Sequence, residues 1–405
     1  MKIAGIIVEF NPMHNGHQYL IQRIQEIEKP DIIIAVMSGN FLQRGEPSIV
    51  SKWLRTEMAL TAGIDVVLEL PYHYAVGHAN LFARGAISIL SECGVTDLYF
   101  GSESGDIASF YHTARHLRNE KNNLDLLVQE KLQQGYSYPK AYSLAYTSTH
   151  TNEMKLLDLS EPNNILGLHY VKVIQELHSS IKAHTILRKG AQHHDQSPHT
   201  HTEFASGTGI RNALMHGNDF IPIRDKMPNE SFKILMRAVN QNQILGWNDF
   251  FPLLKYRLMS SSIEELASIY ESEEGLEFRA MKAIKETNDF FSFISLMKSK
   301  RYTWTRLQRY CCHILLNVSK QKMKSFLETP QTPYLRLLGM SLRGQRYLRC
   351  KKGSFSVPLI SNVKKSFEDL LRIDIRSADV YDMKTSYSEK KSKPLRYDQE
   401  NQRFL

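Results

Sequence analysis

Two histidines three residues apart, His14 and His17, stand in the segment MHNGHQYL near the start of the chain. They follow an apolar run directly and open a stretch with helical spacing. The first turn of a helix has unpartnered N–H groups, and its dipole favours an anion. Gly16 lets the backbone approach such a ligand, and an imidazole on the same face can donate to a phosphoryl oxygen. The spacing indicates chemistry on nucleotide phosphates, although an isolated pair of this kind more often caps backbone groups.

A second group of polar residues lies far along the chain, in FASGTGIRNALMHG (204–217). Ser206, Thr208 and Arg211 stand just before or within the expected start of a helix. Two hydroxyls, exposed amides and a guanidinium can together hold a phosphate. Taken alone, the segment is better explained as a plain helix cap with Ser206 or Thr208 as the capping residue.

Apolar runs alternating with helical patterns must position these residues. Buried strands are predicted at 2–10, 31–39, 64–71, 96–101 and 183–188. Helices are predicted between them, including 51–63, with Ser51 as its cap, and 78–94. Strands that are apolar throughout, with helices between, indicate a parallel sheet covered on both faces. The fold class is therefore α/β, a doubly wound, Rossmann-like domain.

In such a sheet, ligands bind at the carboxyl ends of the strands. Each predicted strand is followed by a segment rich in polar residues, glycine or histidine: EFNPMHNGH, SGNFLQRGEPS, PYHYAVGHAN, GSESGD and RKGAQHHD. Their convergence on one edge is stronger support for a site than either motif alone.

The chain divides into three predicted regions. Residues 1–216 form the α/β domain, with a helical insertion at about 105–180, and 217–328 form a helical domain. Residues 329–405 form a small, basic, mixed region. Within it, YLRC and FSVPLI are predicted as short strands and the polar end KSKPLRYDQENQRFL as frayed.

Composition favours a soluble cytoplasmic protein. The four cysteines form no CxxC pair, which predicts neither a disulfide framework nor a zinc site and fits a reducing compartment. No apolar run approaches the roughly 18 residues of a membrane helix. No metal site is predicted, because irregularly spaced loop histidines are usually solvated. The residues concerned are His193, His194, Asp195, His199 and His201.

The net charge of +9 is unevenly distributed. Residues 1–230 carry 20 Lys and Arg against 24 Asp and Glu, whereas residues 231–405 carry 31 against 18. Residues 298–353 hold 14 basic residues and one acid, Glu328, with aromatic residues interleaved. This mixture favours a polyanion with stackable bases, such as nucleic acid, over a merely solvated basic face.

HNGH and SGTGIR together resemble the HxGH and ISSTxxR signatures of the nucleotidyltransferase superfamily. Gly207 stands where a second serine is usual. No KMSKS-type motif is present, which argues against an aminoacyl-tRNA synthetase. A narrower resemblance, to the bacterial tRNA(Met) cytidine acetate ligase family, rests on six blocks in order: GIIVEFNPMHNGH, MSGNFLQRGEP, GIDVVLELP, FGSE, EPNNILG and KRYTWTRLQR.

That resemblance implies a two-step reaction. ATP and acetate would give acetyl-adenylate and pyrophosphate. The acetyl group would then pass to the exocyclic amine of the wobble cytidine in elongator tRNA(Met), giving N(4)-acetylcytidine. Mg²⁺ is expected with ATP, held mostly by phosphates and water. The protein would mainly position the groups and stabilise spreading charge.

The resemblance also implies roles for individual residues. His14 and His17 are the expected catalytic residues at the α-phosphate. The expected ATP contacts are Ile7, Val8, Glu9, Phe10, Asn11, Pro12, Met13, His14, Asn15, Gly16, His17, Gly101, Asn163, Arg188, Ser206, Thr208 and Arg211. Independently of the resemblance, the loop after the second strand lies at the active edge, which favours an acetate pocket or a tRNA contact over a plain turn. Its residues are Ser38, Gly39, Asn40 and Arg44. The expected tRNA contacts are Lys300, Arg301, Arg306 and Arg309, whereas Trp304 is expected in the core.

Two other hypotheses about the function remain open. Another HxGH enzyme, such as a citrate lyase acetate ligase or a small-molecule adenylyltransferase, would share the adenylation chemistry, but the basic 298–353 segment argues against it. An RNA-binding protein that uses ATP only as a structural ligand would release no pyrophosphate in response to acetate.

Overall fold

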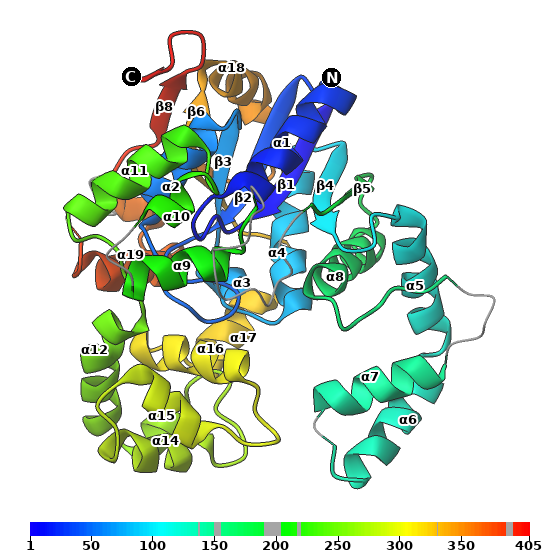
Figure 1. The fold of residues 1–405 in the computed structure, drawn as a ribbon, viewed down its shortest axis with the longest axis vertical. Helices are drawn as coiled ribbons and strands as arrows, with labels where there is room; N and C mark the ends of the chain where they lie inside the picture. Colours follow the sequence, from blue (N-terminus) through cyan, green and yellow to red (C-terminus); the bar gives the residue numbers. More distant parts are fainter. Residues whose placement is uncertain (137, 150–154, 190–203, 217–219, 330, 386–391) are drawn as a thin grey trace.

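A computed structural model describes the chain except residues 137, 150–154, 190–203, 217–219, 330 and 386–391. In the described residues, nine strands form one sheet in the order β5-β4-β1-β2-β3-β6-β8-β9, with β7 beside β6 (Figure 1). The strands are β1 (Ile3–Val8), β2 (Ile32–Ser38), β3 (Val66–Leu70), β4 (Asp97–Ser102), β5 (Lys182–Leu187), β6 (Leu335–Ser341), β7 (Leu359–Ile360), β8 (Leu395–Asp398) and β9 (Arg403–Phe404).

The first five strands confirm the predicted parallel sheet. β1 pairs in parallel with β2 and β4, β2 with β3, and β4 with β5. The predicted helices between them are also present, as α1 (Asn15–Glu28), α2 (Lys52–Thr61) and α4 (Ala79–Glu92). Ser51 caps α2, since its hydroxyl accepts the N–H of Leu54. The α/β fold class is therefore confirmed.

Alternate residues of the strands face two separate cores. On β2, Ile33 and Met37 belong to the core under α1, α2 and α11 (Asn229–Asn240), whereas Ile34 and Val36 belong to the core under α4 and α8 (Pro162–Glu176). All seven residues of β2 are buried. Burial on both faces explains why the strand carries no polar alternation.

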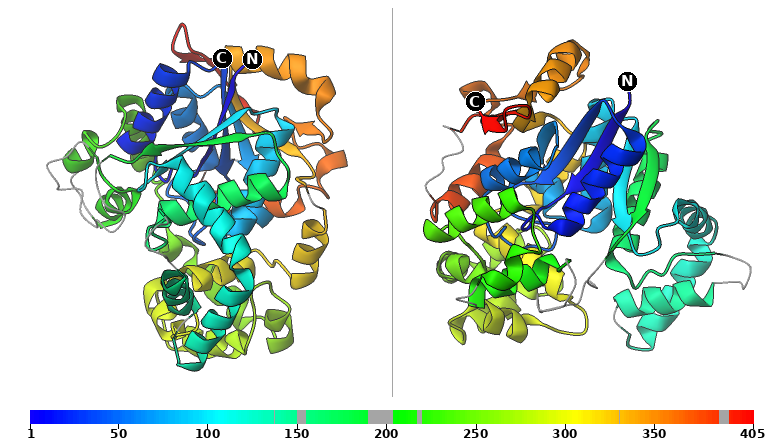
Figure 2. Two further views of the ribbon diagram at one scale, coloured as in Figure 1. Left: turned by 90° about the vertical axis from the view of Figure 1, so that its right-hand side faces the viewer. Right: turned by 45° about the horizontal axis from the view of Figure 1, so that its top comes forward.

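Two groups of helices extend beyond the carboxyl ends of the strands. The first group is α5 (Ile107–Asn119), α6 (Lys121–Gln133) and α7 (Tyr138–Ser148) of the insertion, whose last helix, α8, instead packs against α4 and β4. After α9 (Gly207–His216), α10 (Ile221–Arg224) and α11 come α12 (Trp247–Met259), α13 (Ile263–Ala267), α14 (Leu276–Lys285), α15 (Phe290–Met297), α16 (Trp304–Leu315) and α17 (Lys320–Leu327). In Figure 1 and the right panel of Figure 2, α5–α7 project at the lower right, on the side of β5, and α12–α17 lie at the lower left.

The end of the chain differs from the prediction. YLRC is not a strand but part of α18 (Leu342–Lys351), which buries Tyr347 and Leu348 on one face and is capped by Ser341. Of FSVPLI only Leu359–Ile360 forms a strand. The polar terminus is not frayed, because β8 pairs with β6, and β9 with β8.

The reason for these differences is long-range pairing. β6 runs antiparallel to β3 and carries the sheet beyond it. Asp65 anchors the junction: its carboxylate accepts from Ser341 at 2.7 Å and from Arg343 at 2.9 and 2.8 Å. α19 (Arg372–Asp382) then packs near α3 (Tyr72–Ala75), so the last quarter of the chain closes onto the first.

None of the helices in the described part of the chain is long and apolar enough to cross a membrane.

Candidate active site

A cleft of about 540 Å³ lies at the carboxyl edge of the parallel strands. Most of the predicted ATP-contact residues line it: Ile7, Val8, Glu9, Phe10, Asn11, Pro12, His14, Gly16, His17, Gly101, Asn163, Arg188, Ser206, Thr208 and Arg211. They come from the ends of β1, β4 and β5 and the starts of α1, α8 and α9, so segments far apart in the sequence meet at one place.

His14 and His17 form a capping box at the start of α1. The Gly16 N–H donates to His14 Nδ1 at 3.1 Å, and the His14 N–H donates to His17 Nδ1 at 3.2 Å. The two rings stack with their centroids 3.8 Å apart. The pair therefore caps the helix and lines the cleft with the same side chains.

Both imidazoles are neutral near pH 7. Burial, together with the charges of Arg188 and Arg211, lowers the pKa of His14 to about 3. Burial, followed by His14 and Arg188, holds the pKa of His17 well below its usual value. A neutral imidazole has one donor nitrogen and one acceptor nitrogen. Because each Nδ1 accepts a backbone N–H, each Nε2 carries the proton and can donate to an anion.

Arg211 joins the second motif to the first. Its Nη1 donates to the carbonyl of Asn11 at 2.8 Å, and its Nη2 donates to the Thr208 hydroxyl at 3.2 Å. Glu46 lies 3.6 Å from the same guanidinium. Ser206 accepts the Gly209 N–H at 2.9 Å and so caps the start of α9. Two helix starts thus face one cleft, each with donors for an anion.

Gly207 allows this close approach. A Cβ at this position would lie 3.2 Å from Arg211 Nη1 and 3.3 Å from the Asn11 carbonyl oxygen. The serine usual at this position would crowd the guanidinium in this arrangement, so the glycine and the bond from Arg211 to Asn11 fit one another.

A third group comes from β4, β5 and α8. Arg188 Nη1 donates to Asn163 Oδ1 at 3.4 Å, and Asn163 donates to Glu103 at 2.5 Å. Gly101 lies against the side chain of Arg188, whose Cγ would be 3.3 Å from an added Cβ. These predicted residues therefore lie together on the β4–β5 side of the cleft.

Two predicted ATP residues do not line the cleft. Met13 is fully buried in the core under α1 and α2. Asn15 faces the segment after α10, with its amide donating to the Asp225 carbonyl at 2.8 Å.

The predicted acetate pocket is brought together only in part. Arg44 lines the cleft, whereas Ser38, Gly39 and Asn40 are buried beneath it. Arg55 donates to the carbonyls of Ser38 and Gly39. Asn40 Oδ1 accepts the Lys52 N–H at 2.9 Å. These three residues shape the floor on which the cleft rests.

Several lining residues were not predicted from the sequence. An apolar part of the cleft is formed by Phe82, Phe100, Leu166 and Tyr170. Lys189 lies 5.0 Å from the centre of the Tyr19 ring at another part. Thr305, from the first turn of α16, also lines the cleft, so the helical segment reaches the same site. Their positions depend on tertiary packing, which leaves no local motif.

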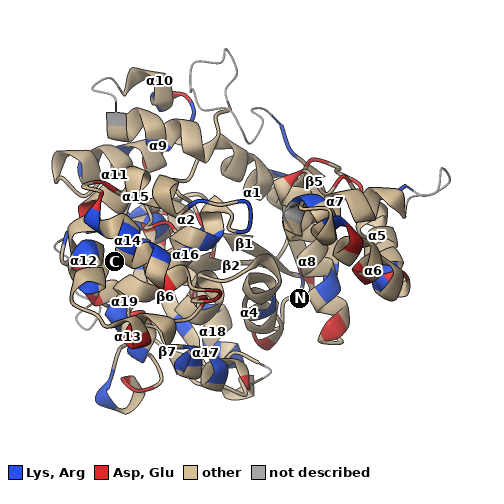
Figure 3. Ribbon diagram, turned by 90° about the horizontal axis from the view of Figure 1, so that it is seen from below, with Lys and Arg blue, Asp and Glu red and all other residues tan. Residues whose placement is uncertain are grey.

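The predicted tRNA residues lie at and before α16. Arg301 lies 3.5 Å from Glu274, and its side chain is 79% exposed. Arg306 pairs with Glu273, and its side chain is 29% exposed. Lys300 is exposed, whereas Arg309 is buried and bonds Glu271 at 2.9 Å. Figure 3 shows further Lys and Arg on α12, α14 and α17. Trp304 is partly buried against the core, as predicted.

No group of three metal-ligating side chains gathers anywhere in the described residues. The histidine-rich loop considered from the sequence, His193 to His201, lies outside them.

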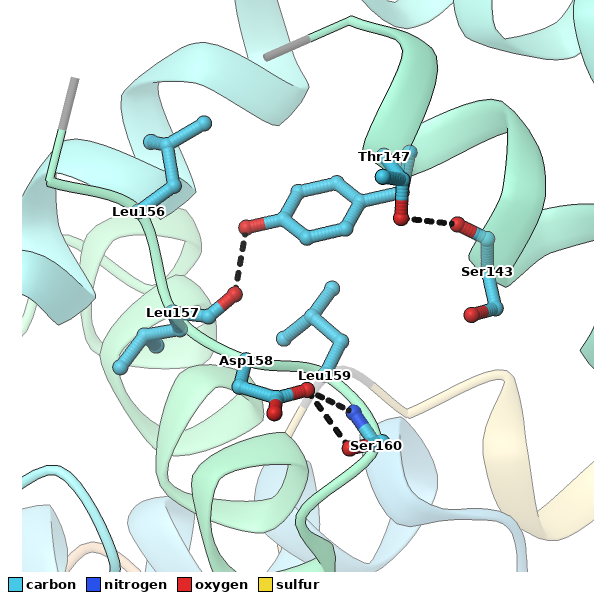
Figure 4. Close-up of a pocket in the computed structure, with 8 residues that line it drawn as sticks. Ser143, Thr147, Leu156, Leu157, Asp158, Leu159 and Ser160 are labelled. Atoms are coloured by element: carbon cyan, nitrogen blue, oxygen red, sulfur yellow. Dashed lines mark hydrogen bonds between the residues drawn. The ribbon is translucent and has the colours of Figure 1, made fainter. Parts of the chain in front are cut away.

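A second, smaller cavity of about 290 Å³ lies between α7 and residues 156–160 (Figure 4). Its polar groups bond one another: the Tyr146 hydroxyl donates to the Leu157 carbonyl at 2.9 Å, and Asp158 accepts from both the N–H and hydroxyl of Ser160. These bonds hold the segment that leads into α8.

The fold and the paired helix starts define a class, and sequence comparison agrees. The profile of the HIGH Nucleotidyl Transferase family matches residues 1–395, so the chain is a HIGH nucleotidyltransferase.

Full-length relatives define the family within that class. The tRNA(Met) cytidine acetate ligases of Bacillus licheniformis and Bacillus subtilis are each 42% identical to this chain. Both alignments cover 100% of this chain and 100% of the relative. That of Halalkalibacterium halodurans is 44% identical over 94% of this chain and 92% of its own. This chain therefore belongs to the tRNA(Met) cytidine acetate ligase family.

Solved structures agree in the arrangement of the whole chain. The crystal structure of apo Thermotoga maritima TmcAL matches with a TM-score of 0.87 at 34% identity, over 97% of both chains. The form of that protein bound with alpha-thio ATP matches with a TM-score of 0.84 at 33% identity, again over 97% of both chains.

Proposed function

We propose that this protein is an ATP-dependent acetate ligase acting on elongator tRNA(Met). It forms acetyl-adenylate from ATP and acetate, and transfers the acetyl group to the exocyclic amine of the wobble cytidine. The observation that carries the proposal is the cleft, in which a neutral histidine pair and the start of α9 meet the first turn of α16. The full-length similarity to tRNA(Met) cytidine acetate ligases supports the choice of substrates.

In the first step, an acetate oxygen attacks the α-phosphate and pyrophosphate leaves. His14 and His17 donate from Nε2 to phosphate oxygens as negative charge grows on them. Because both rings stay neutral, the donation needs no change of protonation around pH 7. Ser206, Thr208 and Arg211 hold the β and γ phosphates, and Arg211 provides the planar guanidinium suited to them.

The remaining ATP contacts follow the shape of the cleft. The backbone of residues 7–17 cradles the nucleotide from the end of β1, and Gly101, Asn163 and Arg188 bind it from the β4–β5 side. Mg²⁺ is expected to accompany ATP, where it would be held mostly by phosphate oxygens and water and would neutralise charge on the phosphates. Arg44 is the residue of the predicted acetate pocket that can reach acetate or tRNA.

The helical segment 217–328 and the basic region 329–405, whose strands extend the sheet of the α/β domain, bind tRNA. Lys300, Arg301 and Arg306 contact phosphates, and the two arginines exchange their acidic neighbours for the polyanion. Arg309 has a different role in this proposal: its pair with Glu271 is buried and holds the loop before α14.

Incubation with ATP, radiolabelled acetate and total tRNA tests the proposal. We expect label on one elongator tRNA species, with pyrophosphate release that depends on acetate. Label on a protein-bound thiol would indicate a citrate lyase type of acetate ligase, and pyrophosphate release with a different acid would indicate another adenylyltransferase. Absence of labelled tRNA with active wild-type protein overturns the proposal.

A further inference from the structure

The acetyl-transfer step needs a group that accepts a proton. The lone pair of a cytidine amine is delocalised into the ring, so the amine is a weak nucleophile, and it becomes acidic as it bonds to the acetyl carbon. A positioned base that takes this proton contributes about 10²–10⁴-fold to such a step. The base must lie in the cleft, near the acetyl group.

Few side chains in the cleft can act as this base. His14 and His17 use Nδ1 to accept backbone N–H groups, and their pKa values are lowered, so neither takes up a proton readily. Two carboxylates line the cleft among the described residues, Glu9 and Glu46. Glu46 is paired with Arg211. Glu9 is the carboxylate that remains.

Glu9 is held through one oxygen and open at the other. Its Oε1 accepts the Gln43 N–H at 2.8 Å and the Ser38 hydroxyl at 3.3 Å. No described residue donates a hydrogen bond to Oε2. Arg55 fixes the backbone of the same residue, donating to the Glu9 carbonyl at 2.7 Å. The hydrogen bonds to Oε1 thus orient the carboxylate, and Oε2 remains as an acceptor for a group in the cleft.

Glu9 bonds a loop that contacts the helical segment. Gln43, its partner, belongs to the loop 41–46, which rests directly on α16: a Cβ at Gly45 would be 2.2 Å from the Arg309 backbone nitrogen. Trp247 of α12 also donates to the Gly45 carbonyl at 2.8 Å. A cytidine ring that enters the cleft from the side of the helical segment therefore passes the loop that carries Gln43.

We propose that Glu9 is the general base of acetyl transfer, accepting a proton of the cytidine amine at Oε2. This rests on the proposed function. The amine nitrogen bonds to the acetyl carbon, and the bond from that carbon to the phosphate oxygen breaks with its electron pair going to AMP. The proton lost by the amine moves to Oε2, so the step balances without another reactant.

The charges around Glu9 suit this role. Burial raises its pKa above the usual value, as does Glu46, whereas the Gln43 N–H, Arg44 and Arg55 oppose that rise. Tyr170 of α8 also interacts with Glu9: burial, followed by the charge of Glu9, raises the pKa of the Tyr170 phenol, which therefore stays neutral. A carboxylate with a raised pKa is a stronger base, so desolvation favours proton acceptance. Transfer should rise with pH as Glu9 loses its proton.

Glu9→Gln tests the role with the two half-reactions measured separately. Acetate-dependent exchange of pyrophosphate into ATP reports adenylation, and single-turnover reaction of supplied acetyl-adenylate with tRNA reports transfer. The amide keeps an acceptor for Gln43 and Ser38 but takes up no proton. We expect transfer to fall about 100-fold or more and to lose its rise with pH, while adenylation falls about threefold at most.

Two comparison variants separate base chemistry from structure. Glu46→Gln changes the other carboxylate of the cleft and should alter the KM for ATP while leaving the rise of transfer with pH. Ser38→Ala removes one hydrogen bond to Oε1 and should slow transfer several-fold with the pH profile kept. Equal loss of both half-reactions in Glu9→Gln, or transfer that keeps its rate or pH profile, overturns the inference. Wild-type protein that labels no tRNA would overturn the proposed function instead.

Discussion

The cleft has two walls of opposite character. The donor wall, defined here as His14, His17, Ser206, Thr208 and Arg211, offers N–H and O–H groups and a positive charge. The acceptor wall, defined as Glu9 and Glu46 at the end of β1 and in the loop after β2, offers carboxylates. Phosphates bind to donors, whereas an amine that loses a proton needs an acceptor. A two-step reaction in one cleft can therefore divide its chemistry between two walls.

The walls also differ in how they are held. The donor wall is built on the starts of two helices, where the backbone itself contributes donors. The acceptor wall rests on a floor of buried polar groups, including Arg55 and the Lys52–Glu69 ion pair at 2.7 Å. Its loop also contacts α12 and α16. Changes in the donor wall should therefore affect adenylation first, and changes near the acceptor wall should affect transfer to tRNA.

The largest effect on the donor wall is expected from His17→Ala. This change removes the Nε2 donor that we propose binds the phosphates, so adenylation should fall about 100- to 1,000-fold, as for loss of one donor to a developing oxyanion. Binding of tRNA, measured by filter retention, should stay near the wild-type value, because α16 is untouched. His112→Ala, an exposed histidine on α5, is the matched control. Loss of tRNA binding with adenylation intact would remove the distinction between the walls.

The same histidines make stability depend on pH. The folded pKa of His14, about 3, is below the unfolded value of about 6.5, so the unfolded chain binds the extra proton. This contribution is complete above about pH 6.5 and is lost as the pH falls toward 3. The free energy of unfolding should drop by about 1.4 kcal/mol per pH unit for each such histidine in that window.

Urea unfolding at several pH values measures this slope. His73 and His313, whose pKa values burial also lowers to about 3, act in the same direction, so the comparison needs a variant. His14→Asn keeps a residue suited to capping α1 and removes one titrating ring, which should make the slope shallower. An unchanged slope would mean that folding does not lower the pKa of His14.

Arg211→Lys is expected to have an effect of about tenfold. Lysine keeps the charge but cannot bond both the Asn11 carbonyl and Thr208 in the fork geometry of the guanidinium. Losing one charge-assisted hydrogen bond costs about 1.5 kcal/mol, so the KM for ATP in pyrophosphate exchange should rise about tenfold. Arg224→Lys, exposed at the end of α10, is the control. An equal loss in transfer from supplied acetyl-adenylate would place Arg211 in both steps.

The donor wall could be predicted from sequence, because its signals are local. HNGH comes after the apolar run Ile3–Val8, and residues 206–211 carry hydroxyls and an arginine at a helix start. The acceptor wall could not be predicted in the same way. What distinguishes Glu9 from Glu46 is the ion pair of Glu46 with Arg211, which joins residues 165 positions apart in the sequence. The burial of Ser38 and Asn40 likewise depends on Arg55 and Lys52 from the next helix.

The fold shows the same limit. β2 is buried along its whole length, so its apolar run was sufficient to predict it. β6 and β8 are recognisable only by their partners, since β6 pairs with β3 and β8 with β6. YLRC was misread because Tyr347 and Leu348 look like a short apolar strand until the cap at Ser341 and the packing of α18 are known. Local periodicity carries no information on such partners.

Of these variants, Gly207→Ala should change activity the least, and it should affect adenylation without affecting transfer. Its methyl group would meet Arg211 Nη1 at 3.2 Å and the Asn11 carbonyl oxygen at 3.3 Å, closer than an ordinary contact. The guanidinium must move by a few tenths of an ångström, so the KM for ATP in pyrophosphate exchange should rise by about two- to fourfold, with transfer from supplied acetyl-adenylate unaffected. Gly353→Ala, where nothing lies within 4 Å of the added methyl, is the control for a glycine change alone. A larger loss in transfer than in exchange would show that the donor wall also positions the acetyl group, and the two walls would then share the second step.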